Sequence, residues 1–96
     1  MSIHVTARER AHLKARAHSL EPLVQIGQAG LSDAVVAEVA RALTAHELIK
    51  VKIKVDDRDE RDALAQTLAT RTDATAIQRV GKVLVLWRPR PEDDEA

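Results

Sequence analysis

The chain has 96 residues, enough for one domain and too few for two. It contains no cysteine, which excludes a disulfide framework, and no apolar run approaches the roughly 20 residues that span a membrane. The formal net charge is zero, but four of the 15 acidic residues lie in the stretch 92–95, which leaves 11 against 15 basic ones in the body of the chain. We expect a cationic domain over residues 1–90, a disordered acidic tail over residues 91–96, and, without a signal-peptide pattern, a cytoplasmic protein.

The first predicted element is a helix over residues 6–18. Thr6 can cap its N-terminus, and Glu9 stands at the capping-box position three residues later. The apolar face is thin, with Leu13 and Ala17, and most of the remaining surface is cationic. A cationic helix face can be merely solvated or can bind phosphates, and the pattern is compatible with both. The candidate phosphate-binding side chains of this helix are Arg8, Arg10, Lys14, Arg16 and His18.

A short strand over residues 23–26 leads into Gly27-Gln28-Ala29-Gly30, and Ser32 can then cap a helix over about residues 33–45. The glycines allow a tight turn and a close ligand approach, and the helix N-terminus offers unpaired N–H groups. On its own the motif is compatible with a simple connection that binds nothing. If it binds phosphate, the N–H groups of Gln28 to Leu31 are the expected donors. The candidate contact residues are Gly27, Gln28, Ala29, Gly30, Leu31 and Ser32.

The clearest strand pattern covers residues 48–55, in which apolar and basic residues alternate strictly. Ile49, Val51 and the following apolar residues should point toward a core, whereas Lys50, Lys52 and Lys54 should point to the other face of the sheet. That second face is expected to be solvated and basic. Its lysines can serve solubility alone, or Lys50 and Lys52 can contribute to an extended platform for RNA.

The remainder of the chain predicts one more helix and two strands. Asp57 can cap a helix that ends near residue 71, with an inward face formed by Ala63, Leu64, Leu68 and, less clearly, Thr67. Strands over residues 74–80 and 82–88 form a hairpin at Gly81. The predicted order is α-β-α-β-α-β-β. It indicates a single α/β (α+β) domain with a mixed four-stranded sheet and helices mainly on one face.

No catalytic or metal-binding arrangement is visible, and we expect neither an enzyme nor a cofactor or metal. The acidic residues at positions 56–62 are explained better by helix capping than by a metal site, and the four histidines lack the spacing of zinc ligands. Trp87 is the chain's only aromatic residue, so aromatic stacking cannot dominate binding, which argues against an RRM-like mode that needs several stacking rings. Its register with Val83 and Val85 favours a packing role.

Four ordered blocks of sequence resemble the CRM domain (chloroplast RNA splicing and ribosome maturation), in particular the stand-alone bacterial YhbY-like proteins. They are the basic first helix ending Ala17-His18, followed by Leu20-x-Pro22; the segment Gly27-Gln28-Ala29-Gly30-Leu31-Ser32; the segment His46-Glu47-Leu48-Ile49-Lys50-Val51-Lys52-Ile53; and the segment Gly81-Lys82-Val83-Leu84-Val85-Leu86-Trp87-Arg88-Pro89. The resemblance covers about residues 5–90. It implies a fold similar to the C-terminal domain of translation initiation factor three, with a KH-like GxxG loop.

The resemblance also implies RNA binding, with precursor large-subunit ribosomal RNA as the target and ribosome assembly as the role. Relatives often carry a cation inside the glycine loop, where this chain has Gln28. We therefore expect the loop to supply backbone donors, and the charge to come from Arg8, Arg10, Lys14 and Arg16. Two alternatives stay open: a protein-interaction module on the assembling ribosome, and a non-specific binder of double-stranded nucleic acid. No membrane partner or small-molecule substrate is expected.

Overall fold

The computed structural model describes residues 5–89 of the chain. Within them the elements follow the predicted order, with three helices and four strands. They are α1 (Ala7–Ala17), β1 (Pro22–Ile26), α2 (Asp33–His46), β2 (Leu48–Ile53), α3 (Arg58–Arg71), β3 (Thr75–Val80) and β4 (Val83–Trp87). The acidic tail expected at residues 91–96 lies outside the described residues.

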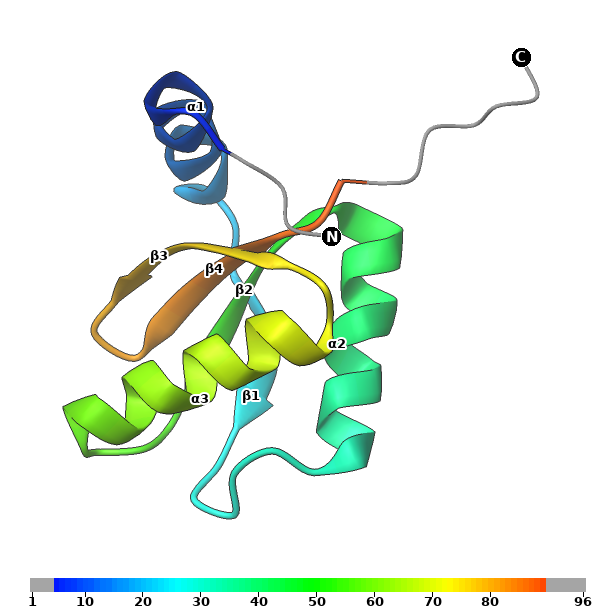
Figure 1. The fold of residues 1–96 in the computed structure, drawn as a ribbon, viewed down its shortest axis with the longest axis vertical. Coiled ribbons are helices and arrows are strands. Elements are labelled where there is room, and N and C mark those ends of the chain that lie inside the picture. Colours follow the sequence, from blue (N-terminus) through cyan, green and yellow to red (C-terminus); the bar gives the residue numbers. More distant parts are fainter. Residues whose placement is uncertain (1–4, 90–96) are drawn as a thin grey trace.

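The four strands form one mixed sheet in the order β1-β2-β4-β3 (Figure 1). β1 runs parallel to β2, and α2 provides the crossover connection that a parallel pair needs. β4 is antiparallel to both of its neighbours, β2 and β3. The turn between β3 and β4 contains Gly81 with φ +60°, a conformation that suits glycine. The predicted α+β class, mixed sheet and terminal hairpin are therefore confirmed.

Helices α2 and α3 cover one face of the sheet and enclose the main hydrophobic core. The alternation in β2 places Ile49, Val51 and Ile53 on this face, each at most 1% exposed. Val55, just beyond the strand, is buried in the same cluster. The period-2 pattern thus correctly predicted which residues of β2 face the core.

Helix α1 packs on the opposite face, over part of the sheet. Its two apolar residues, Leu13 and Ala17, are buried against Leu48, Ile77 and Val85 in a second, smaller cluster. The sequence predicted a second face that is solvated and basic. The structure corrects this prediction, because α1 covers one end of that face and only the remainder is open.

All three helices begin at the predicted caps. Thr6 and Glu9 form a reciprocal capping box, Ser32 accepts a hydrogen bond from the N–H of Val35, and Asp57 accepts one from the N–H of Glu60. These side chains satisfy N–H groups that a helix leaves unpaired at its N-terminus. The capping interpretation of the acidic residues at the start of α3 is thereby confirmed for Asp57.

The inward face of α3 differs from the prediction. Leu64 and Leu68 do pack toward the core, but Ala63 and Thr67 are exposed. Their places are taken by Ala65 and Ala69, each 6% exposed. The inward face of the helix is therefore rotated by about one residue position, roughly 100°, from the predicted face. Two alanines at the contact let the helix lie close to the sheet. The sequence of α3 has so few large apolar residues that its pattern does not specify which face of the helix points inward.

Candidate nucleic-acid interface

The glycine loop, Gly27–Gly30, is a tight turn at the end of β1, at the opposite end of that strand from α1 (Figure 1). The N–H of Gly30 donates to the carbonyl of Gly27 over 3.0 Å, and Gly30 has φ +82°. A Cβ atom built on either glycine would meet no heavy atom within 4 Å. The loop is therefore open to a ligand, and Gly30 is required by the backbone conformation rather than by the space around it.

One of the backbone donors expected of this loop is already used. Because the Gly30 N–H closes the turn, the prediction that all N–H groups from Gln28 to Leu31 face a phosphate is wrong at Gly30. The remaining N–H groups of Gln28, Ala29 and Leu31 make no hydrogen bond to the described part of the chain. Leu31 itself is half-buried against the core, so only its backbone is suited to contact a ligand.

The chain just after β2, at Lys54, lies beside the loop, whereas α1 lies at the other end of β1. The side-chain Nε2 of Gln28 donates to the carbonyl of Lys54 over 3.3 Å, and the N–H of Lys54 donates to the carbonyl of Ile26 over 2.7 Å. These bonds hold the exposed Lys54 beside the loop. The expectation that the first helix supplies the charge at the loop is therefore corrected.

Lys54 ends a row of three lysines, Lys50, Lys52 and Lys54, which we call the lysine row. Lys50 and Lys52 alternate in β2 with the core-facing Ile49, Val51 and Ile53, and Lys54 is the residue after the strand. Alternate residues of an extended chain are about 6.6 Å apart, so the row is about 13 Å long. Lys50 Nζ donates to the carbonyl of Leu20 over 3.0 Å, just after α1. The lysine row thus connects the end of α1 to the glycine loop across the open face of the sheet.

The cations of α1 fall into three groups. Arg10 is half-buried, and its Nη1 donates to the carbonyls of Ala76 and Ile77 in β3, which makes it a structural residue. Lys14 and His18 lie on the flank that faces the lysine row. Arg8 and Arg16 lie on the other flank, near Trp87. The predicted cationic helix is real, but its side chains do not form one surface.

A hollow of about 280 Å³ lies between α1 and the open face of the sheet, and we call it the inner hollow. Among the described residues, Lys14, His18 and Lys50 are the basic side chains that line it, and no carboxylate does. The other lining residues are Ala17 of α1, Gln78 and Val80 of β3, and Val83 and Val85 of β4. A concave, basic surface of this kind concentrates phosphate groups. Sequence reasoning missed the contributions of β3 and β4, which depend on strand pairing.

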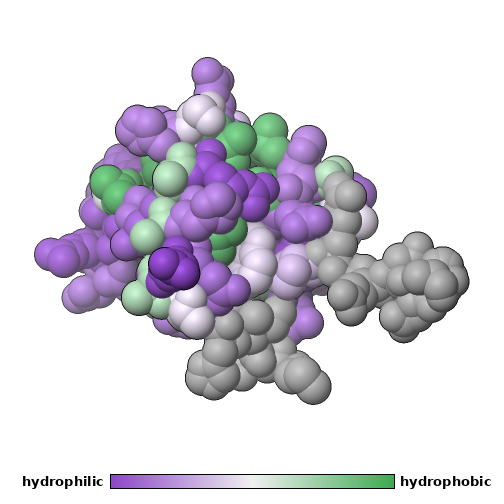
Figure 2. Space-filling view, turned by 90° about the horizontal axis from the view of Figure 1, so that it is seen from above, coloured by the Kyte–Doolittle hydropathy of each residue, from purple (hydrophilic) through white to green (hydrophobic). Residues whose placement is uncertain are grey.

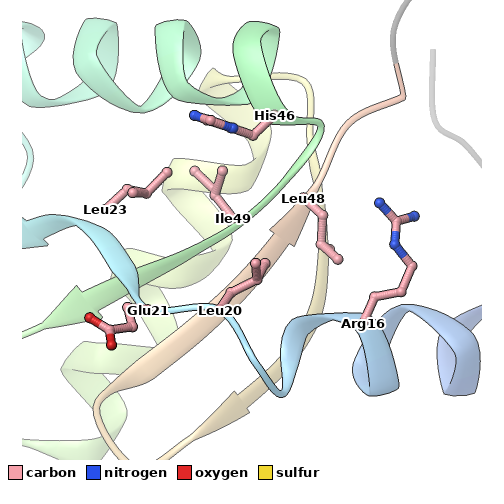
Figure 3. A pocket seen from close by; sticks show the side chains of 7 residues that line it. All are labelled: Arg16, Leu20, Glu21, Leu23, His46, Leu48 and Ile49. Carbon is pink, nitrogen blue, oxygen red and sulfur yellow. The ribbon is translucent and has the colours of Figure 1, made fainter.

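A second hollow, of about 290 Å³, lies where α1, β1 and the end of α2 meet (Figure 3). Its charged side chains carry both signs, since Arg16 and Glu21 line it together with His46. Leu20 and Leu23 border it and are 37% and 52% exposed. This hollow offers apolar contact more than phosphate binding.

Viewed from above, the surface of the molecule is mainly hydrophilic with small apolar patches (Figure 2).

The described residues contain no group of three or more histidine, cysteine or carboxylate side chains that could hold a metal ion. Several of the acidic side chains after β2 have partners instead: Asp62 pairs with Arg79, and Asp56 with Lys82 over 3.0 Å. No helix within residues 5–89 is long and apolar enough to cross a membrane.

The sequence matches the CRS1/YhbY (CRM) domain over residues 5–88. It is 39% identical over 88 residues to a Haemophilus influenzae protein named RNA-binding protein, with 92% of this chain and 89% of the relative covered. It is 34% identical over 91 residues to a protein of Pseudomonas aeruginosa named as a probable RNA-binding protein, with 95% and 88% covered.

Among solved structures, the fold is similar to the solution structure of a Staphylococcus aureus protein, with a TM-score of 0.82 and 29% identity. The similarity covers 96% of both chains, so the whole domain is shared and not only the glycine loop. The blocks of sequence that carry the resemblance lie on α1 and the start of β1, on the glycine loop, on β2 and on β4. The chain belongs to the CRS1/YhbY (CRM) domain family.

Proposed function

We propose that this protein binds structured RNA on the open basic face of its sheet, from the glycine loop along the lysine row to the inner hollow. The observation that carries the proposal is the position of the lysine row. It begins beside the end of α1, where Lys50 contacts Leu20, and ends at the glycine loop, where Lys54 contacts Gln28. Cations and free backbone donors therefore lie along one path.

The chemistry of this path fits a phosphate backbone. Lysine binds phosphate as a point charge without base-specific geometry, and backbone N–H groups at a helix N-terminus add hydrogen bonds and a partial positive charge. The chain has a single aromatic residue, Trp87, with which to stack a base, so most of the affinity is expected from phosphates. Relatives named as RNA-binding proteins support RNA as the nucleic acid.

The target we propose, from the family resemblance, is precursor large-subunit ribosomal RNA during ribosome assembly in the cytoplasm. Such a role needs binding and no catalysis. It is consistent with a surface that offers cations and backbone donors. On this view the protein recognises the folded shape of the RNA backbone more than its sequence.

The test measures binding of labelled large-subunit ribosomal RNA fragments by fluorescence anisotropy. The double variant Lys52→Ala/Lys54→Ala should bind at least 10-fold more weakly than the unmodified protein. The matched control is Arg41→Ala/Arg58→Ala, which removes two exposed cations from α2 and α3, the helices of the opposite face. If the two double variants lost the same amount of RNA affinity, the loss would be explained by net charge alone, and the proposed surface would be contradicted. Equal affinity for duplex DNA would favour the non-specific alternative.

A protein-docking function is the second candidate, and one observation favours it. Leu20 and Leu23 are exposed beside the hollow of Figure 3, and β1 is an edge strand of the sheet. An apolar pair next to a strand edge can bind an extended segment of another protein. Substituting both leucines by serine should then abolish association with assembling ribosomal particles while leaving the affinity for purified RNA unchanged.

A further inference from the structure

Trp87 lies at the end of β4, on the face that α1 covers, and packs beside Leu13 in the smaller hydrophobic cluster. The predicted packing role is therefore confirmed. The ring is only half-buried, however, and it also lines a hollow of about 430 Å³ on the flank of α1 that faces away from the lysine row. We call this the outer hollow. It is lined by Arg8, Glu9, His12, Leu13, Arg16, Glu47 and Trp87.

The charges in the outer hollow have a definite arrangement. Arg8, His12 and Arg16 are four residues apart along α1, so they form one stripe with a rise of about 6 Å per step. Two carboxylates also line the hollow: Glu9, whose Oε1 accepts from the N–H of Thr6, and Glu47. A hollow with both signs of charge is poorly suited to a row of phosphates alone. It suits a ligand with an uncharged polar part that is flanked by anionic groups.

The backbone at Glu47 is strained. This residue joins α2 to β2 with φ 66° and ψ −44°, a conformation that non-glycine residues rarely adopt. Its N–H donates to the carbonyl of Leu43 over 2.8 Å, and its carbonyl accepts from the N–H of Arg88 over 2.9 Å. These bonds fix an energetically costly turn that places a glutamate at the rim of the hollow. Strain of this kind is concentrated at functional sites.

We propose that the outer hollow holds one unpaired nucleobase of the bound RNA, which stacks on the accessible side of Trp87 while Arg8 and Arg16 contact the phosphates on either side of it. A nucleotide has the required form, a flat polar ring attached to an anion. The size of the hollow falls within the range of small-molecule sites. The inference rests on the proposed RNA binding and adds a site for a bulged or single-stranded nucleotide on the far flank of α1.

Trp87 itself is the probe, because the chain contains no other tryptophan and no tyrosine. Its intrinsic fluorescence is titrated with a short unstructured RNA oligonucleotide, an abasic ribose-phosphate oligomer of equal length, and inorganic polyphosphate. We expect quenching by the RNA at the concentrations at which anisotropy reports binding, and none by the two base-free polymers. Equal quenching by all three, or binding of the RNA without quenching, would overturn the proposal.

Two substitutions separate stacking from packing. Trp87→Phe keeps an aromatic ring and should keep affinity for the single-stranded oligonucleotide within about threefold. Trp87→Leu keeps an apolar side chain but removes the ring, and should weaken binding about 5- to 150-fold, which corresponds to the loss of one stacked base. Thermal unfolding of both variants establishes that the cluster with Leu13 still forms. Equal affinity for the two folded variants would contradict stacking.

The outcomes also distinguish this inference from the proposed function. If RNA binds and depends on Lys52 and Lys54 but leaves Trp87 fluorescence unchanged, only the nucleobase site is wrong. If no RNA binds, both are wrong. If deletion of residues 90–96 changes Trp87 fluorescence in the absence of RNA to the same extent that RNA does in the full chain, the C-terminal segment is the occupant and the proposal is overturned.

Discussion

The side-chain amide of Gln28 donates a hydrogen bond to the main-chain carbonyl of Lys54 over 3.3 Å. This contact joins the glycine loop to the end of β2, 26 residues further along the chain. It gives Gln28 a structural role in the loop. The glutamine holds the loop against the chain segment that follows β2, so the main chain of Lys54 lies beside the loop.

A charged substitution in the glycine loop tests the loop as a phosphate contact. Gly27 is the better of the two glycines for this purpose, because its φ is not positive and a Cβ there meets open space, whereas Gly30 has φ +82°. Gly27→Asp should therefore leave the melting temperature almost unchanged. It should weaken RNA binding about 10-fold or more through repulsion of a nearby phosphate, as measured by anisotropy.

Gly27→Ala is the matched control, since it adds a Cβ without charge. We expect it to retain affinity within about threefold, because nothing lies within 4 Å of the added atom. If Gly27→Asp were folded and bound RNA as tightly as Gly27→Ala, the glycine loop would not contact the RNA.

The salt dependence of RNA binding should reveal how many phosphates the lysine row contacts. Each phosphate that a cation neutralises contributes about −0.7 to −0.9 to the slope of log K against log salt concentration. Loss of both Lys52 and Lys54 should therefore make the slope less steep by about 1.4 to 1.8. Titrations of the same RNA fragment between low and moderate salt measure this change. An unchanged slope would mean that neither lysine contacts a phosphate, whatever happened to the affinity.

Much of this surface could be predicted from the sequence. The part that could not be predicted depends on contacts between residues that are far apart in the chain. Caps and periodicities are local signals, so the helix starts at Thr6, Ser32 and Asp57 and the inward residues of β2 were predicted correctly. The order of strands is set by non-local pairing, which such signals do not contain. The closeness of Lys54 to the glycine loop follows only from the parallel pairing of β1 with β2.

The thin apolar face of α1 raises a related point. Leu13 and Ala17 correctly indicated a buried stripe, but two residues do not specify which face of the sheet they cover. The structure places α1 on the lysine side, and this placement divides its cations between two flanks and ties Arg10 to β3. A list of basic residues therefore predicted the charge of the helix but not the surface that the charge forms.

The acidic residues at positions 92–95 lie outside the described residues, and their effect on binding is a prediction from charge alone. If they compete with RNA for the basic face, deletion of residues 92–96 should tighten RNA binding severalfold at low salt. The gain should disappear as salt rises, because screening weakens both interactions. Replacing the four acidic residues by Gln and Asn keeps the length and serves as the control. The same affinity for all three proteins at low salt would contradict the competition.

The last prediction concerns Arg10, which sequence analysis placed among the RNA contacts. Its guanidinium is half-buried and donates to the carbonyls of Ala76 and Ile77, next to the irregularity in the β3–β4 pairing. Arg10→Ala would leave these carbonyls without that donor. Since hydrogen bonds to charged groups contribute about 1.5–3 kcal/mol, the free energy of unfolding should fall by about that amount. Chemical denaturation monitored by circular dichroism measures the loss.

Lys14→Ala is the matched control on the same helix, because Lys14 is exposed and lines the inner hollow. It should leave the free energy of unfolding within about 0.5 kcal/mol of the original value, as is usual for surface substitutions, while it weakens RNA binding. Arg10→Ala, assayed well below its melting temperature, should show the opposite pattern, with lower stability and an affinity close to that of the unmodified protein. If Arg10→Ala kept the original free energy of unfolding but bound RNA more weakly, Arg10 would belong to the RNA-binding surface.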